Sequence, residues 1–168
     1  MSIKIGDRLP EGKLSELIEA ETEGCSLGPN TFAVAELIKG KKIVIFGLPG
    51  AYTPTCSARH VPGYVQHAQA LKAKGVDEIW CTAVNDAFVM AAWGHTQQAI
   101  GVVRMMADGN ADFCTALGLD ADFSSRGMGT RSQRYSMLVE DGIVTQLNVE
   151  QSGVFEVSSA ETLLQQLA

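Results

Sequence analysis

Short apolar runs, separated by turn residues and by amphipathic stretches, set the pattern of this chain. Residues 43–46 read Ile-Val-Ile-Phe between a lysine pair and a glycine, which is typical of a fully buried strand. A similar run lies at 79–84 and a third at 102–106, and helix-compatible stretches separate the three. This alternation predicts two β-α-β units, in which helices connect parallel strands.

The rest of the chain predicts further strands, helices and turns. Residues 1–30 alternate only weakly and predict short strands or a hairpin. The runs 135–139 and 143–149 are separated by Glu-Asp-Gly, and an Asp-Gly pair in this position strongly indicates a hairpin. A helix is predicted over 32–38, capped by Asn30 or Thr31, and another over 87–98, capped by Asn85 or Asp86. A longer helix is predicted from Pro54 to Gly75, with an interruption at 61–64. Two further helices are predicted over 111–117 and 161–167, and a loop over 124–132.

Two β-α-β units followed by a hairpin and a terminal helix define an α/β fold with a mixed central β-sheet flanked by helices. The thioredoxin-like fold has this order of elements. A length of 168 residues fits a single domain over 1–168, which buries about 70% of the surface that the unfolded chain exposes. In such a sheet the site lies at the carboxyl ends of the strands. The turn after 43–46 is therefore the first place to look for chemistry.

A cysteine lies where that turn becomes a helix. Thr53-Pro54 is a helix-start signal, because Thr is a good N-cap and Pro is tolerated at the first helical position. Cys56 then occupies the third helical position, within the turn whose backbone N–H groups have no partner inside the helix. The positive end of the helix dipole favours the thiolate form of a cysteine, which is the reactive form. The sequence therefore indicates that Cys56 is a nucleophile.

Composition excludes several classes of function. The chain has 13 basic and 19 acidic residues, a net charge of −6, which argues against a nucleic-acid partner. It has no apolar run of the roughly 18 residues that a membrane span needs, so no membrane partner is expected. The first residues lack an apolar signal segment and include an acid at Asp7, so a cytoplasmic location is expected.

The cysteines are widely spaced. None forms a C-x-x-C pair, so neither a dithiol redox motif nor a zinc knuckle is predicted. We expect free thiols rather than a disulfide framework. Cys81 lies within a predicted strand and should be an inert buried thiol, and Cys25 and Cys114 are expected to be structural or incidental.

The segment around Cys56 resembles the P-x-x-x-T-x-x-C signature of the peroxiredoxins, with Pro49, Thr53 and Cys56 at its fixed positions. The continuation through His60-Val61-Pro62-Gly63-Tyr64 is similar to the type II, peroxiredoxin-5-like branch. Two further blocks, 84–93 and 134–139, agree with that branch in order and spacing. The resemblance covers nearly the whole chain.

The resemblance implies thiol-dependent reduction of hydrogen peroxide and alkyl hydroperoxides, with no metal or organic cofactor. Cys56 would be the peroxidatic thiolate, which attacks the O–O bond and becomes a sulfenic acid. Thr53 would hydrogen-bond the thiolate or the peroxide, Arg134 would hold the thiolate and polarise the peroxide, and Pro49 would shield the site from water. The chemistry needs such a set, because a cation must favour S⁻ and donors must stabilise the charge on the leaving oxygen.

Alternative interpretations stay open for several of these residues. Thr53 also suits a helix N-cap, and by spacing alone Arg126 or Arg131 could be the cation in place of Arg134. His60 lies one helical turn after Cys56 and is either a packed histidine or a group that tunes the thiol. A Cys-His hydrolase would need an acid to orient His60, and none is identified. A redox sensor or holdase would use Cys56 only as an oxidisable switch.

The cysteine pattern also bears on the catalytic cycle. Several relatives of this branch carry a resolving cysteine in the C-terminal segment, at a place that holds Val157 here, and no cysteine follows Cys114. We therefore expect a one-cysteine cycle, in which an external thiol reduces Cys56. The resemblance suggests glutathione with glutaredoxin first and thioredoxin second. It also suggests a homodimer, formed through Tyr52, Phe88 and the 124–130 segment.

Overall fold

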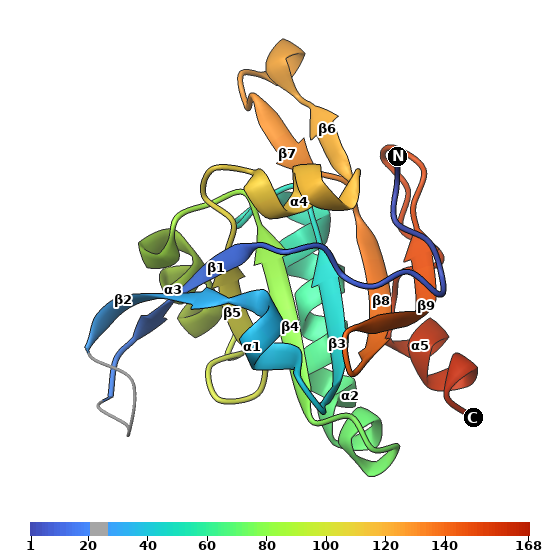
Figure 1. Cartoon of the computed structure of the whole chain (residues 1–168). Coiled ribbons are helices and arrows are strands. Elements are labelled where there is room, and N and C mark those ends of the chain that lie inside the picture. The colour runs from blue at the N-terminus through green and yellow to red at the C-terminus, as the bar shows by residue number, and fades with distance from the viewer. Residues whose placement is uncertain (21–26) are drawn as a thin grey trace.

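The computed structural model describes residues 1–20 and 27–168, so Cys25 lies outside the described residues. Seven strands form one mixed sheet in the order β2-β1-β5-β4-β3-β8-β9 (Figure 1). The strands of this sheet are β1 (Lys13–Ile18), β2 (Gly28–Ala33), β3 (Lys42–Gly47), β4 (Glu78–Ala83), β5 (Arg104–Ala107), β8 (Tyr135–Glu140) and β9 (Ile143–Val149). A separate two-stranded ribbon, β6 (Asp120–Asp122) and β7 (Thr130–Ser132), projects from one end of the sheet.

Helices cover both faces of the sheet, because the buried strands alternate side chains between two apolar cores. In β3, Val44 and Phe46 join the core beneath α2 (Val61–Ala73), α3 (Ala87–Thr96) and α5 (Ala160–Gln166). Ile43 and Ile45 join the opposite core, beneath α1 (Val34–Ile38) and α4 (Asp112–Leu117). The predicted α/β, thioredoxin-like arrangement is therefore confirmed. No helix in the described ranges is both long and apolar enough to cross a membrane.

The predicted β-α-β units and their turns are confirmed. Strands β3, β4 and β5 are parallel neighbours, while β8 pairs antiparallel with β3. Asp86, one of the two predicted caps, accepts a hydrogen bond from the Val89 N–H at 2.8 Å, although α3 ends at Thr96 rather than at 98. The Asp141-Gly142 turn has positive φ at both residues (47° and 83°), which is the geometry of a tight two-residue hairpin turn.

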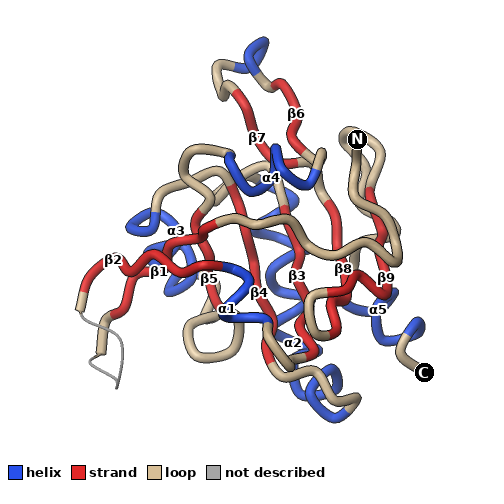
Figure 2. Tube along the Cα trace, viewed as in Figure 1, coloured by secondary structure: helices blue, strands red, loops and turns tan. Residues whose placement is uncertain are grey.

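Two segments differ from their predictions. Residues 32–33 belong to β2 and pair with β1, so α1 begins at Val34 and neither Asn30 nor Thr31 caps it. The predicted loop 124–132 contains β7 and a short 3₁₀-helix, η2 (Ser124–Arg126), visible at the tip of the projecting ribbon in Figure 2. Pairing between β6 and β7 organises this segment, and it has no apolar alternation that a sequence pattern detects.

Close packing at the end of β3 fixes the start of the functional turn. Gly47 is paired with Tyr135 of β8, and a Cβ on Gly47 would lie 2.2 Å from the Tyr135 ring. Glycine is therefore required there by contact with the ring of a neighbouring strand. This packing sets the turn that follows β3 directly beside the start of β8.

Candidate active site

Cys56 lies at the start of the helix that follows β3, as predicted. The helix begins at Pro54, and the Thr53 carbonyl accepts the first helical bond from Ser57 N–H at 3.0 Å. Cys56 is the third helical residue and is fully buried. Five residues after it, at Val61, the chain enters α2 with no intervening loop.

The helix is not interrupted at 61–64 as predicted, because these residues lie within α2; the irregular turn comes just before them. Residues Cys56–His60 form a π-helical turn, η1, in which Val61 N–H bonds to the Cys56 carbonyl. Pro62 follows in the first turn of α2. A proline inside an α-helix lacks the N–H and clashes with the carbonyl four residues before it. A local π turn relieves that conflict, and such turns frequently occur at functional sites.

Arg134 is the arginine that contacts the sulfur. Its Nη2 lies 3.2 Å from Cys56 Sγ. Arg134 immediately precedes β8, and the antiparallel register of β8 with β3 (Tyr135 opposite Gly47) brings it to the Cys56 turn. The two rival cations are engaged elsewhere: Arg131 donates to the Met128 and Pro49 carbonyls, and Arg126 lies over the Phe123 ring.

His60 holds the other side of the Arg134 guanidinium. Arg134 Nη1 lies 2.9 Å from His60 Nδ1, and His60 Nε2 lies 3.1 Å from the Ser158 carbonyl. A carbonyl cannot donate, so Nε2 carries the proton and Nδ1 accepts from the arginine. Burial, together with the charge of Arg134, lowers the pKa of His60 to about 3. His60 is therefore a packed, neutral histidine with no ring nitrogen free to act as a base, which rules out the Cys-His hydrolase.

Thr53 occupies the predicted N-cap position, but its hydroxyl does not cap the helix. Thr53 Oγ1 donates to the Gly50 carbonyl at 2.7 Å, and within residues 1–20 and 27–168 no N–H of the following turn donates to this hydroxyl. The hydroxyl lone pairs therefore stay available as acceptors. Pro49 lies beside Thr53 on the wall of the same pocket, and both residues are half-buried.

A carboxylate that the sequence reading missed organises the neighbouring loop. Glu150 is buried, and its Oε2 accepts from the N–H groups of Glu156, Val157 and Ser158 and from the Ser158 hydroxyl, at 2.7–2.9 Å. The Ser158 carbonyl then receives His60 Nε2 and the Tyr64 hydroxyl. Contacts thus run from Glu150 through Ser158, His60 and Arg134 to Cys56. No local pattern signals this, because the partners are brought together only by the fold.

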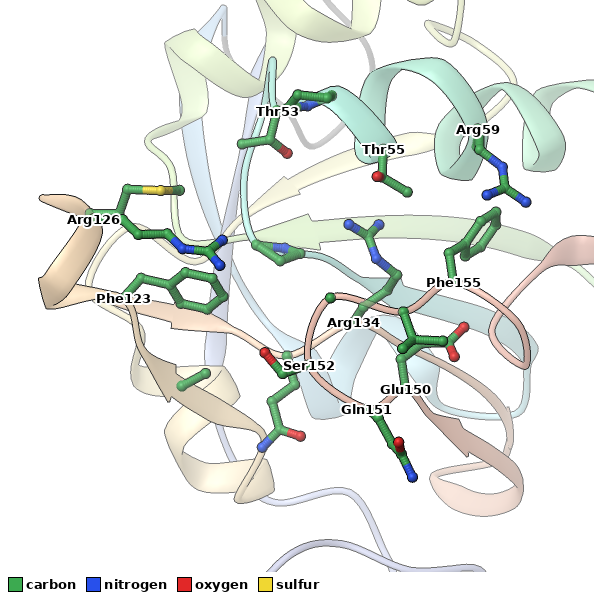
Figure 3. Close-up of a pocket in the computed structure, with 17 residues that line it drawn as sticks. Thr53, Thr55, Arg59, Phe123, Arg126, Arg134, Glu150, Gln151, Ser152 and Phe155 are labelled. Carbon is green, nitrogen blue, oxygen red and sulfur yellow. The ribbon is translucent and has the colours of Figure 1, made fainter.

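Pro49, Thr53, Arg134 and Glu150 line one pocket of about 430 Å³ at the carboxyl end of β3. Cys56 is fully buried and does not itself line the pocket, but its sulfur contacts Arg134, which does. Figure 3 shows Arg134 at the centre of the pocket, with Thr53 and Thr55 above it and Glu150 below. Phe155 lies at one side and contacts His60 with ring centroids 4.9 Å apart. Within 1–20 and 27–168 no cluster of three or more His, Cys, Asp or Glu side chains is suited to a metal ion.

The other described cysteines are poor nucleophiles. Cys81 is fully buried in β4, and burial raises its pKa well above the ordinary thiol value. Burial, reinforced by the nearby Asp108 carboxylate, raises the pKa of Cys114 to about 12. Its sulfur also donates to the Ala111 carbonyl at 3.4 Å. Both residues match their predicted structural roles.

Comparisons with known proteins agree with this geometry. Residues 4–164 match the Redoxin family, so the chain is a redoxin. Peroxiredoxin-2B of Arabidopsis thaliana is 46% identical over 98% of both chains. The chain therefore belongs to the type II peroxiredoxins, as the resemblance implied. Relatives of this kind include proteins named as chloroplastic and mitochondrial.

Solved structures give the same picture. Reduced Prx3 from Vibrio vulnificus in complex with hydrogen peroxide is 51% identical, with a TM-score of 0.91 and 99% coverage of both chains. A Burkholderia cenocepacia protein, provisionally described as a thioredoxin reductase, is 57% identical, with a TM-score of 0.98 and coverage of 100% of this chain and 99% of its own. That description does not transfer to a chain without a C-x-x-C motif.

Proposed function

We propose that this chain, as a single domain over 1–168, is a thiol-dependent peroxidase that reduces hydrogen peroxide and alkyl hydroperoxides through Cys56. The observation that carries the proposal is the contact of 3.2 Å between Arg134 Nη2 and Cys56 Sγ at a helix start. A guanidinium at that distance stabilises negative charge on the sulfur and is never deprotonated. The complex of the Vibrio vulnificus relative with hydrogen peroxide supports the substrate class.

In the oxidative step the Cys56 thiolate attacks the nearer peroxide oxygen and the O–O bond breaks. Sulfur is oxidised to a sulfenic acid, and the leaving oxygen takes up a proton to become water or an alcohol. Arg134 stabilises the charge that develops as the O–O bond breaks, which is the usual role of a fixed donor at a reacting oxygen. The lone pairs of Thr53 accept from the peroxide O–H, and Pro49 limits access of water to the pocket.

In the reductive step an external thiol attacks the sulfenic sulfur, water leaves, and a second thiol releases Cys56 from the mixed disulfide. Cys81 and Cys114 cannot substitute readily, because each is buried and its thiol pKa is raised. Val157, at the place where several relatives carry a resolving cysteine, is 41% exposed and has no thiol. We propose glutathione with glutaredoxin as the first reductant and thioredoxin as the second.

We also propose a cytoplasmic homodimer. Tyr52 and Phe88 are 54% and 62% exposed, which is unusual for large aromatic side chains. Tyr52 lies in the active-site turn and Phe88 in the first turn of α3. The 124–130 segment belongs to the ribbon that projects from one end of the sheet (Figure 1). Sedimentation at micromolar concentration should give a dimer, and a monomer at all concentrations would reject this part of the proposal.

The test of function is peroxide consumption with dithiothreitol as the thiol. We expect many turnovers per protein molecule and no turnover for Cys56→Ser, with Cys81→Ser as the matched control that keeps activity. A single stoichiometric oxidation of Cys56, with no further consumption, would instead support the sensor or holdase. A Cys81→Ser variant without turnover would reject the one-cysteine cycle.

A further inference from the structure

The active-site pocket is much larger than hydrogen peroxide requires. Its volume is about 430 Å³, whereas a water molecule takes up about 30 Å³ of liquid and a peroxide has only two oxygens. Pockets of about 300–1,000 Å³ are those that hold small organic molecules. The pocket therefore has room for a substrate with a substantial organic part.

Two arginines at the rim lie on aromatic rings that form the walls. Arg59 Cζ lies 4.7 Å from the centroid of the Phe155 ring, and Arg126 Cζ lies 5.5 Å from that of Phe123. Figure 3 shows these two pairs on opposite sides of the pocket, with Arg134 between them. Stacking on a ring holds a guanidinium in place while its N–H groups remain available to a ligand.

Neither rim arginine is neutralised by a carboxylate. In the described part of the chain, no ion pair involves Arg59 or Arg126. The lining residues include one acid, Glu150, and its Oε2 is engaged by four donors of the 156–158 segment. Positive charge is thus concentrated at this pocket in a chain whose net charge is −6.

We propose that Arg59 and Arg126 form an anion-binding rim, which takes the carboxylate of an organic small molecule whose reactive end reaches Cys56. The inference rests on the proposed peroxidase function. The carboxylate has two possible sources. A hydroperoxide acid would oxidise the Cys56 thiolate to a sulfenic acid and leave as the hydroxy acid after taking up a proton. A thiol acid would displace water from the sulfenic acid and form a mixed disulfide.

The kinetic test compares each acid with its neutral ester. Linoleic acid hydroperoxide is paired with its methyl ester, and glutathione with its diethyl ester. In Arg59→Gln and in Arg126→Gln, the ratio of kcat/KM for acid over ester should fall about tenfold, because a charge-assisted contact is lost. Lys39→Gln removes the same charge from an exposed site on another part of the molecule and should keep the wild-type ratio.

The two acid–ester pairs identify which molecule supplies the carboxylate. A fall confined to the hydroperoxide pair assigns the rim to the oxidising substrate, and a fall confined to the glutathione pair assigns it to the reductant. Unchanged ratios in both pairs would overturn the proposal. Hydrogen peroxide and dithiothreitol are both neutral, so their turnover does not depend on the anion-binding rim. A lack of turnover with this pair would therefore count against the proposed peroxidase function and not against the rim.

A binding measurement tests the rim without catalysis. Cys56→Ser should bind decanoate more tightly than decanol, and added salt should weaken the difference. Arg126→Gln in the same background should lose about tenfold in decanoate affinity. Equal binding of decanoate and decanol by Cys56→Ser would overturn the proposal even if the enzyme were inactive.

Discussion

Arg104, the first residue of β5, and Arg134, which immediately precedes β8 of the same sheet, are both half-buried, yet they have opposite kinds of partner. Arg104 donates to both oxygens of Glu16 and to Glu78, with contacts of 2.7–3.2 Å. Arg134 has no carboxylate partner in the described part of the chain; it meets a neutral histidine and the Cys56 sulfur. One arginine is neutralised and the other keeps its charge for the site.

The carboxylates near the two arginines also differ in their partners: Glu78 pairs with Arg104, whereas Glu150 does not pair with Arg134. Burial opposes the charged form of Glu78, but hydrogen bonds from Lys41 and Arg104 outweigh it and lower its pKa to about 2. Glu150 lies in the pocket of Arg134, yet its hydrogen bonds go to backbone N–H groups of a loop. A carboxylate paired with Arg134 would compete with the thiolate for the guanidinium. The fold thus keeps a structural acid close to the site while leaving the arginine free to act.

The sharpest test of this difference is Arg134→Lys, which keeps the charge but loses the planar fork of donors. A lysine cannot hold His60 and the sulfur at the same time with the geometry of a guanidinium. We expect the rate of Cys56 oxidation by hydrogen peroxide to fall on the order of 10²-fold, by analogy with loss of one oxyanion donor. Stopped-flow measurement gives the rate, and a rate near wild type would assign the role to Arg126 or Arg131.

Substitution of Arg104, the other arginine, should lower the free energy of unfolding without changing peroxidase activity. Arg104→Gln leaves Glu16 and Glu78 without their shared cation, and we expect a loss of about 2 kcal/mol in the free energy of unfolding. Urea denaturation measures this loss, with exposed Lys39→Gln as a control that should change little. Activity per folded molecule should stay at the wild-type level. An activity loss as large as that of Arg134→Lys would refute the contrast between the two arginines.

The parts of the site that could be predicted are those with local signals. Thr53-Pro54 is a local helix-start signal, so the position of Cys56 followed from the sequence even though the Thr53 hydroxyl bonds the Gly50 carbonyl instead of capping the helix. The Asp141-Gly142 turn and the Asp86 cap are equally local. Each of these signals depends on the backbone preferences of two or three neighbouring residues.

The remainder depends on strand register and on contacts between distant residues. Choosing Arg134 over Arg126 and Arg131 requires the pairing of β8 with β3, which residue spacing alone does not predict. Only the resemblance of residues 134–139 to the type II peroxiredoxins indicated Arg134. His60 and Ser158 are 98 positions apart, so neither sequence neighbourhood contains the other. The 124–132 segment was wrongly predicted as a loop for a similar reason, because its strand β7 is defined by pairing with β6.

The free energy of unfolding should decrease at acid pH, because His60 stays neutral beside Arg134 in the folded protein. The pKa of His60 is lowered from 6.5 to about 3 in the folded protein. Between these values the unfolded chain binds a proton that the folded chain does not, so stability falls as the pH falls below 6.5. From pH 7 to pH 5 the loss from this residue is about 2 kcal/mol.

Urea denaturation at the two pH values measures that loss, and nitrogen NMR of the His60 ring reports its protonation directly. At pH 5 the ring should still be neutral with the proton on Nε2. A doubly protonated His60 in the folded protein at pH 5 would contradict the assignment. His67→Gln is a suitable control and should leave this loss unchanged, because His67 is half-buried and pairs with Glu161 of α5 rather than with Arg134.

The smallest effect is expected for Glu150→Gln, which tests whether the loop carboxylate positions the arginine. A neutral amide oxygen is a weaker acceptor than a carboxylate for the three N–H groups and one hydroxyl that converge there. The 151–158 loop should loosen, and the Ser158 carbonyl should hold His60 less firmly. We expect the hydrogen peroxide rate to fall about tenfold, in line with the effect of supporting residues around other reactive groups.

A purely structural role would lower only the unfolding midpoint, so the decisive readout is the alkylation rate of Cys56 by iodoacetamide in the folded protein at neutral pH. If Glu150 acts through Arg134, this rate should fall together with the peroxide rate. Glu156→Gln, an exposed change in the same loop that leaves its own backbone N–H in place, should alter neither rate. An unchanged alkylation rate in Glu150→Gln would mean that the arginine is positioned by β8 and His60 without help from the loop.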